Sequence, residues 1–129
     1  MAKIRGLTEV VILVHDMEKS LNFYRDILGL IVMSPADSRG AVFLRIGENI
    51  DAIPGIDLIP QQLVLVPLPK DTDEFPTERT RRPLHHFGVE VATEDFGDEC
   101  DRLQSLGFEV RLGEHPFLPL IGMYLDDPD

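Results

Sequence analysis

Cysteine is almost absent from this chain of 129 residues, which contains Cys100 and no other. A single cysteine cannot form a disulfide within the chain, so a disulfide-stapled fold is excluded and a reducing compartment is favoured. The chain also lacks a run of about 18 apolar residues, and its N-terminus lacks the apolar core of a secretory signal. We therefore expect a soluble, cytoplasmic protein that does not insert into a membrane.

Positive charge is scarce as well. Twelve Lys and Arg against 23 Asp and Glu give a formal net charge of −11. An acidic surface of this size repels phosphate backbones, so nucleic acid is not an expected partner. The remaining composition, with 43% hydrophobic and 27% charged residues, is typical of a globular protein. The length suits one compact domain that can bury a core.

The same order of predicted elements occurs twice along the chain. In the first copy, the alternating, β-branched segment 7–14 predicts a strand. Asp16 can cap the helix that follows, and Gly29 is placed to end it. Further strands of this copy are predicted at 30–34, 40–47 and 63–68.

The second copy follows a linker rich in proline and charge at 69–83. Its first strand is predicted at 84–91, and Thr93 and Gly107 are predicted to begin and end its helix. Its further strands are predicted at 108–112 and 121–126. The chain is thus expected to form an α+β fold of two paired βαβββ modules, module one at about 5–68 and module two at 84–129, whose curved mixed sheet surrounds a pocket.

Side chains alternate between the two faces of a strand, and this alternation predicts which residues face the pocket. In the first strand the apolar set Val10, Ile12 and Val14 is assigned to the helix side, so Glu9 faces the hollow. In segment 84–91 the same reasoning turns His86 and Glu90 toward the hollow and His85 away from it.

Glu9 and His86 therefore occupy equivalent positions in the two modules. If a pseudo-twofold axis relates the modules, these side chains converge. A carboxylate and an imidazole aimed at one point form half of a typical first-row metal site. Around it, Phe43 and Tyr124 are candidate substrate-binding residues or core residues, and Arg45 can bind a substrate carboxylate if its face is inward, which the pattern leaves open.

Three stretches of the sequence resemble the vicinal oxygen chelate superfamily, which includes glyoxalase I, methylmalonyl-CoA epimerase, extradiol dioxygenases, and fosfomycin- and bleomycin-resistance proteins. They are VILVHDMEKSLNFYRDILGL, LHHFGVEV and YLDDPD, and the resemblance covers nearly the whole chain. It implies the glyoxalase/bleomycin resistance/dioxygenase-like fold and a homodimer. It also implies that the chain stops at Asp129, before the last strand of module two.

The resemblance implies a divalent metal ion, Ni, Zn, Co, Mn or Fe. Metal-dependent members carry a histidine where this chain has Glu9, and their second-module histidine matches His86. A further ligand comes from the fourth strand, where the matching residue is Gln62, or Val64 by strict alignment. The last ligand of the family, a glutamate, would lie beyond Asp129.

The implied function is that of a divalent-metal-dependent lyase or isomerase, of glyoxalase or epimerase type, on a small oxygenated substrate. Glu90 is the candidate catalytic base, and Glu9 can alternate between ligand and base. A dioxygenase prefers two histidines and one carboxylate around iron, and only His86 reaches the hollow. The alternative is a metal-free protein that binds a small molecule, as bleomycin-resistance proteins do, or a regulatory dimer with a vestigial pocket.

Overall fold

The computed structural model describes residues 1, 7–33, 40–47, 61–78 and 81–129. It divides the chain into two compact units, Met1–Phe75 with Pro128–Asp129, and Pro76–Asp127. The boundary between them lies inside the segment 69–83 that the sequence marks as a linker.

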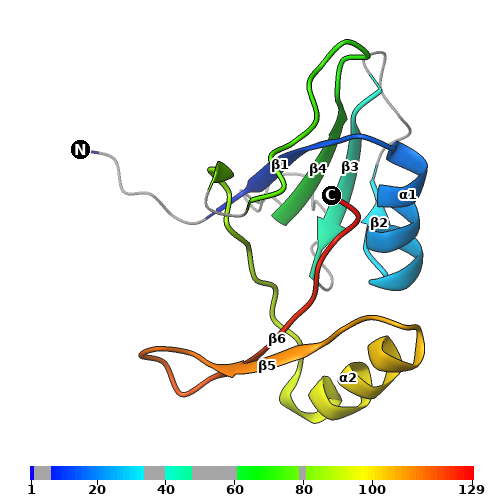
Figure 1. Ribbon diagram of the computed structural model, residues 1–129. Helices are drawn as coiled ribbons and strands as arrows, with labels where there is room; N and C mark the ends of the chain where they lie inside the picture. The colour runs from blue at the N-terminus through cyan, green and yellow to red at the C-terminus, as the bar shows by residue number, and fades with distance from the viewer. Residues whose placement is uncertain (2–6, 34–39, 48–60, 79–80) are drawn as a thin grey trace, which may run out of the picture. The chain divides into compact units, whose positions relative to one another are not determined.

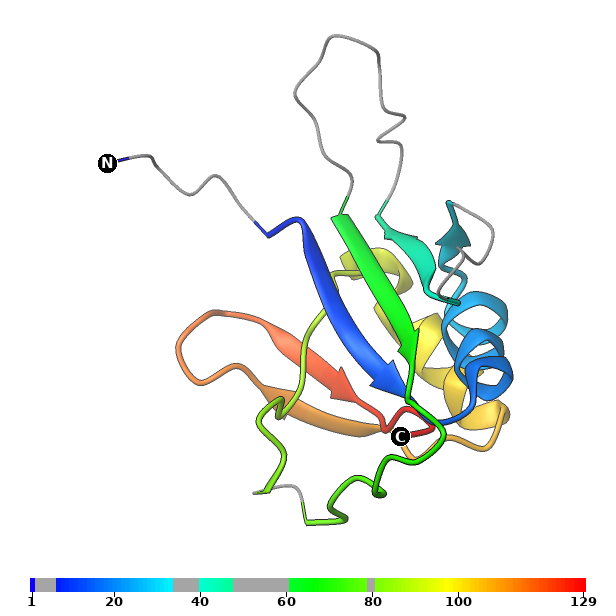
Figure 2. The same ribbon diagram turned by 90° about the horizontal axis from the view of Figure 1, so that it is seen from above.

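Among the described residues of the first unit, four strands form one sheet in the order β1-β4-β3-β2 (Figure 1). Strand β1 runs parallel to β4, and the other neighbours are antiparallel. Figure 2 shows β1 and β4 side by side and pointing the same way. The bounds are β1 Glu9–Val14, β2 Ile31–Val32, β3 Val42–Ile46 and β4 Gln61–Pro67. The predicted α+β class with a mixed sheet is confirmed; Ser34, at the end of one predicted strand, lies outside the described residues.

One helix connects β1 to β2. It begins as α1 (Met17–Leu21) and continues as the π-helical segment η1 (Asn22–Ile27). The Asp16 carboxylate accepts a hydrogen bond from the Lys19 backbone N–H at 3.1 Å, so the predicted N-cap is confirmed. Gly29, with φ of 79°, follows the last turn in the left-handed conformation that closes a helix.

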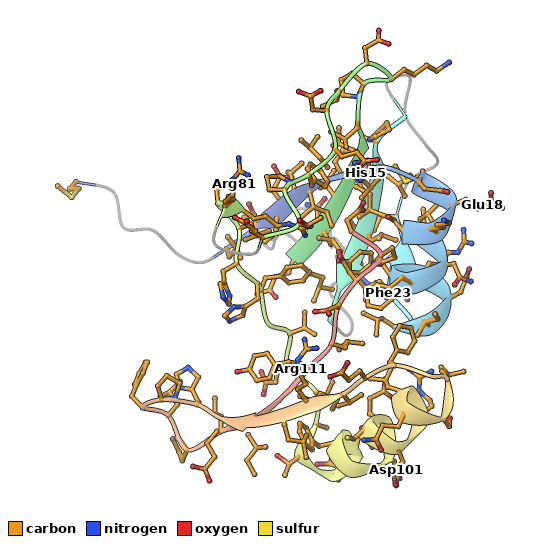
Figure 3. All side chains as sticks on the ribbon, viewed as in Figure 1. His15, Glu18, Phe23, Arg81, Asp101 and Arg111 are labelled. Carbon is orange, nitrogen blue, oxygen red and sulfur yellow. The ribbon has the colours of Figure 1, made fainter. Side chains whose placement is uncertain are left out.

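The core of this unit lies between the helix and one face of the sheet. The strands contribute the fully buried side chains Val14, Leu44, Leu63 and Leu65, which share a face in the observed register. The helix buries Ser20, Phe23 and Tyr24. Figure 3 shows Phe23 on the sheet side of the helix and Glu18 on the opposite side. We call the buried face of the sheet the helix face and the other the opposite face.

The second unit contains one helix and one hairpin among its described elements. A 3₁₀ turn, η3 (Thr93–Asp95), leads into α2 (Phe96–Ser105), and Gly107, with φ of 92°, follows it. The hairpin strands are β5 (Arg111–Glu114) and β6 (Ile121–Tyr124), and they pair antiparallel. Over the part of the chain that the structure describes, no helix has the length and apolar character needed to cross a membrane.

Two local predictions for this unit were wrong. Residues 84–91 carry no strand pairing, and Leu84, Val89 and Val91 are 49%, 52% and 42% exposed. Their alternating pattern supplies the side chains of a strand, but a strand also needs a neighbour to satisfy its backbone groups. Thr93 does not cap the helix, because it lies within η3 and α2 begins three residues later.

Truncation of Leu65 should measure what the helix face contributes to stability. Leu65 is fully buried, so Leu65→Ala removes contacts and leaves a cavity; the free energy of unfolding should fall by about 2 to 5 kcal/mol. The matched control is Leu13→Ala, because Leu13 is 46% exposed on the opposite face and its truncation should cost well under half as much. Urea unfolding of both variants checks this, and equal losses would contradict the assigned faces.

The pair Glu99–Arg102 should make the stability of α2 depend on pH. Two hydrogen bonds of 2.6 and 2.9 Å join the side chains, and the bond from Arg102 lowers the pKa of Glu99. A carboxylate whose pKa is lowered by folding stabilises the folded state at pH values above the ordinary glutamate pKa. This stabilisation is lost as the pH falls through the lowered pKa of the folded state.

Glu99→Gln should therefore destabilise the protein slightly at neutral pH, by well under 1 kcal/mol for a surface pair, and not at all in acid. Asp101→Asn is the control, since Asp101 projects outward from α2 (Figure 3). Denaturation midpoints at several pH values measure both. A Glu99→Gln deficit that persists unchanged in acid would argue against the ion pair.

Candidate functional site

A polar row crosses the opposite face of the first unit's sheet. Glu9 on β1 is in register with Gln62 on β4, and Gln62 is in register with Arg45 on β3. Residues in register project to the same face, and neighbouring strands lie about 4.8 Å apart. Strand β4 begins at Gln61, earlier than predicted, and Val64 is paired with Val11 instead. The register therefore selects Gln62, and not Val64, as the neighbour of Glu9.

The rows next to this polar row are apolar. Val11, Val64 and Phe43 form the second row, and Leu13 and Val66 continue the surface along β1 and β4. Val11 is 52% exposed, and Phe43 is half-buried. Arg45, whose face the sequence left open, lies on the same face as Glu9 and Phe43. The opposite face thus carries one polar row, made of a carboxylate, an amide and a guanidinium, beside an apolar surface.

The two adjacent histidines of the second unit contact each other. Their Nδ1 atoms are 2.6 Å apart, and their ring centroids are 4.9 Å apart. The prediction that His85 points away from His86 was wrong, because segment 84–91 is not a strand and its side chains do not alternate. A hydrogen bond between two Nδ1 atoms requires one of them to carry the proton. It leaves Nε2 of His86 outside this contact.

Tyr124 is held across the hairpin. A Cβ added to Gly122 would lie 3.1 Å from the Tyr124 ring, and one added to Gly113 would lie 3.4 Å from it. The ring therefore covers both glycines, and its centroid is 6.0 Å from that of His86. Arg111, in register with Tyr124, donates to Asp126 at 2.9 Å, and this hydrogen bond raises the pKa of Arg111. The predicted substrate-binding residue Tyr124 also has a packing role.

The candidate residues divide between the two units. Glu9, Gln62, Phe43 and Arg45 belong to the first unit, and His86, Glu90 and Tyr124 to the second. The convergence of Glu9 with His86 stays a prediction. Within the described ranges no group of three or more His, Cys, Asp or Glu side chains is placed to hold a metal ion.

Glu90 lies in a segment that forms no strand. Glu90 is exposed. Its assignment beside His86 came from strand alternation, and that segment is not a strand here. Sequence reasoning also missed His85 as a partner of His86 and the two glycines beneath Tyr124. The adjacency of the histidines and the G-x-x-x-x-x-x-x-x-G spacing of the hairpin are visible in the sequence, but only folding shows their contacts.

A family model decides the relationship of this chain to known proteins. The model of the Glyoxalase/Bleomycin resistance protein/Dioxygenase superfamily matches residues 6–129. The chain belongs to this superfamily. The resemblance seen in its sequence motifs is thereby confirmed, and the superfamily brings together members that differ widely in activity.

Solved structures show the same fold at low sequence identity. An integron cassette protein from the mobile metagenome of a Halifax Harbour sewage outfall aligns with a TM-score of 0.68 and 24% identity, covering 97% of this chain and 91% of its own. Lactoylglutathione lyase from Agrobacterium tumefaciens aligns with a TM-score of 0.62 and 17% identity, and the alignment covers 98% of this chain and 89% of the lyase. The fosfomycin resistance protein FosX from Listeria monocytogenes aligns with a TM-score of 0.61 and 18% identity, and the alignment covers 97% of this chain and 85% of FosX. No curated protein is significantly similar in sequence.

Gly122 should control the position of Tyr124 in this superfamily member. An alanine Cβ at position 122 would come within 3.1 to 3.2 Å of two ring carbons and the hydroxyl oxygen of Tyr124, so Gly122→Ala should displace the ring and alter its contact with His86. Gly113→Ala is the matched control, since its Cβ meets the ring at 3.4 Å, an ordinary contact. Side-chain NMR signals of Tyr124 and His86 should shift in the first variant. Equal shifts in both variants would contradict this placement of the ring.

Proposed function

We propose that this protein is a divalent-metal-dependent lyase or isomerase, of glyoxalase or epimerase type, that acts on a small oxygenated substrate. Glu9, Gln62 and His86 would hold the metal ion. The observation that carries the proposal is the register of β1 with β4, which makes the carboxylate of Glu9 and the amide of Gln62 neighbours on one face. Family membership and the lyase among the similar structures support this class of reaction.

The donor set fits a divalent ion. Glu9 supplies a charged oxygen and Gln62 a neutral oxygen from adjacent strands, and such oxygens combined with an imidazole suit a first-row metal. In the proposed site His86 would bind through Nε2, because its Nδ1 contacts His85. Histidine ligands usually engage their second nitrogen in a hydrogen bond that fixes the ring. Here His85 provides that partner, since the two Nδ1 atoms are 2.6 Å apart.

The chemistry needs a Lewis acid and a base. A divalent ion held there would supply Lewis acidity toward the substrate oxygens. The proton is moved by a carboxylate, for which Glu90 is the first candidate and Glu9 the second. The exposed position of Glu90 gives its carboxylate access to solvent, where it can exchange the proton it removes.

Metal content of the purified protein tests this proposal. We expect a stoichiometric amount of Ni, Zn, Co, Mn or Fe, which His86→Ala and Glu9→Ala should remove. Glu18→Ala is the matched carboxylate control, because Glu18 lies on the far side of α1 and should leave the metal in place. His85→Phe should weaken metal binding about tenfold or more by freeing the His86 ring. A wild-type protein that takes up none of these metals would refute the proposed function.

Activity measurements on the loaded enzyme separate the two candidate bases. Glu90→Gln should retain the metal and lose about a hundredfold or more in kcat in a lactoylglutathione lyase or epimerase assay. If Glu90→Gln is fully active and Glu9→Gln keeps its metal but not its activity, then Glu9 is the base.

A metal-free binding protein is the second candidate function. It is favoured by the carboxylate of Glu9 at the position where metal-dependent members carry histidine, and by the exposed apolar side chains of Val11 and Leu13 on the same face. In this case the opposite face would bind a small molecule without reaction. The metal measurement above separates the two functions.

A further inference from the structure

Arg45 occupies one end of the polar row on the opposite face. The row runs from Glu9 through Gln62 to Arg45, and Arg45 is in register with Ile31 on β2. Two strand spacings separate Glu9 from Arg45, about 10 Å between their backbones. The row therefore has a negative end and a positive end, with an amide between them.

Arginine at this position is suited to a planar anion. Its guanidinium presents several N–H donors in a fixed fork that matches the two oxygens of a carboxylate. The side chain is half-buried, where a charge-assisted hydrogen bond is screened less than on an open surface. In the metal-free protein, Glu9 at the other end of the row repels an anion. A ligand with a single anionic head is therefore oriented with that head toward Arg45.

The apolar side chains beside Arg45 indicate that the rest of the ligand is apolar. Phe43 lies two residues before Arg45 on β3, on the same face, with Val64 and Val11 beside it. Rows on one face are about 7 Å apart along a strand. An apolar chain that leaves the Arg45 end would cover the half-buried Phe43 first, whereas Val64 beside it is already buried. Burial of the ligand chain there removes apolar surface from water.

We propose that Arg45 is the specificity-determining residue for a substrate with a carboxylate at one end and a short apolar chain at the other. The inference rests on the proposed function in taking the opposite face as the substrate surface. It adds the chemical class of the substrate and the residue that selects it. Bound in this way, the ligand has its anionic head at Arg45, two strands away from Glu9, and its chain lies over Phe43.

The test is a titration of the full chain, with metal removed by chelator, with pentanoate and with its neutral isostere pentanamide. Amide chemical shifts report binding. The wild-type protein should bind pentanoate about tenfold more tightly than pentanamide, as a charge-assisted hydrogen bond predicts. Arg45→Gln should remove this preference. Arg25→Gln is the matched control, since Arg25 lies on η1 and pairs with Asp26, and it should keep the preference.

A wild-type protein that binds both compounds equally, or does not bind pentanoate, would overturn the inference. So would an Arg45→Gln variant that still prefers pentanoate. If that variant does not fold, the wild-type protein provides the test. Its amide chemical-shift changes on adding pentanoate should centre on residues 43–45 and 62–64, and changes confined to other segments would refute the site. Because the titration is done without metal, its outcome is independent of the metal measurement that tests the proposed function.

Discussion

The in-register parallel pairing of β1 with β4 is the constraint on which the first unit depends. Parallel neighbours require a crossover, and here the chain supplies it through the helix, β2 and β3 before β4 returns beside β1. The pairing places Leu63 and Leu65 under the helix. By the same alternation it places Gln62 next to Glu9. A shift of the register by one residue would move each of these side chains to the wrong face.

The same pairing separates two chemical environments within one thin layer. On the helix face, leucine and valine side chains are fully buried and supply the stability of the unit. On the opposite face, a carboxylate, an amide and a guanidinium stand in one row beside apolar side chains. A rigid, well-packed strand is a good support for such groups, because packing on one face limits the motion of the side chains on the other.

The second unit holds its candidate residues by different means. Tyr124 covers the glycines of the β5–β6 hairpin, and His86 is in contact with both this ring and His85. Aromatic cover of glycine protects the backbone of a short hairpin that has little other packing. The ring contacts of His86 therefore depend on side-chain packing, whereas Glu9, Gln62 and Arg45 are placed by the ladder of a sheet. This difference explains why alternation gave the observed face of the sheet for Glu9 and failed for His85.

Sequence periodicity by itself determined the α+β class, the βαβββ order of the first unit, the helix cap at Asp16 and the stop at Gly29. It also assigned Val10, Ile12 and Val14 to the helix face. These features depend on neighbours in the chain or on a two-residue repeat, so a local pattern contains them. The family signature in the same sequence was also sufficient for the superfamily. The structure alone decided that Gln62 neighbours Glu9, that Arg45 shares their face, that 84–91 forms no ladder and that the two histidines meet. Each of these depends on which distant segment lies alongside, and hydrogen-bond partners between distant segments are chosen only when the chain folds.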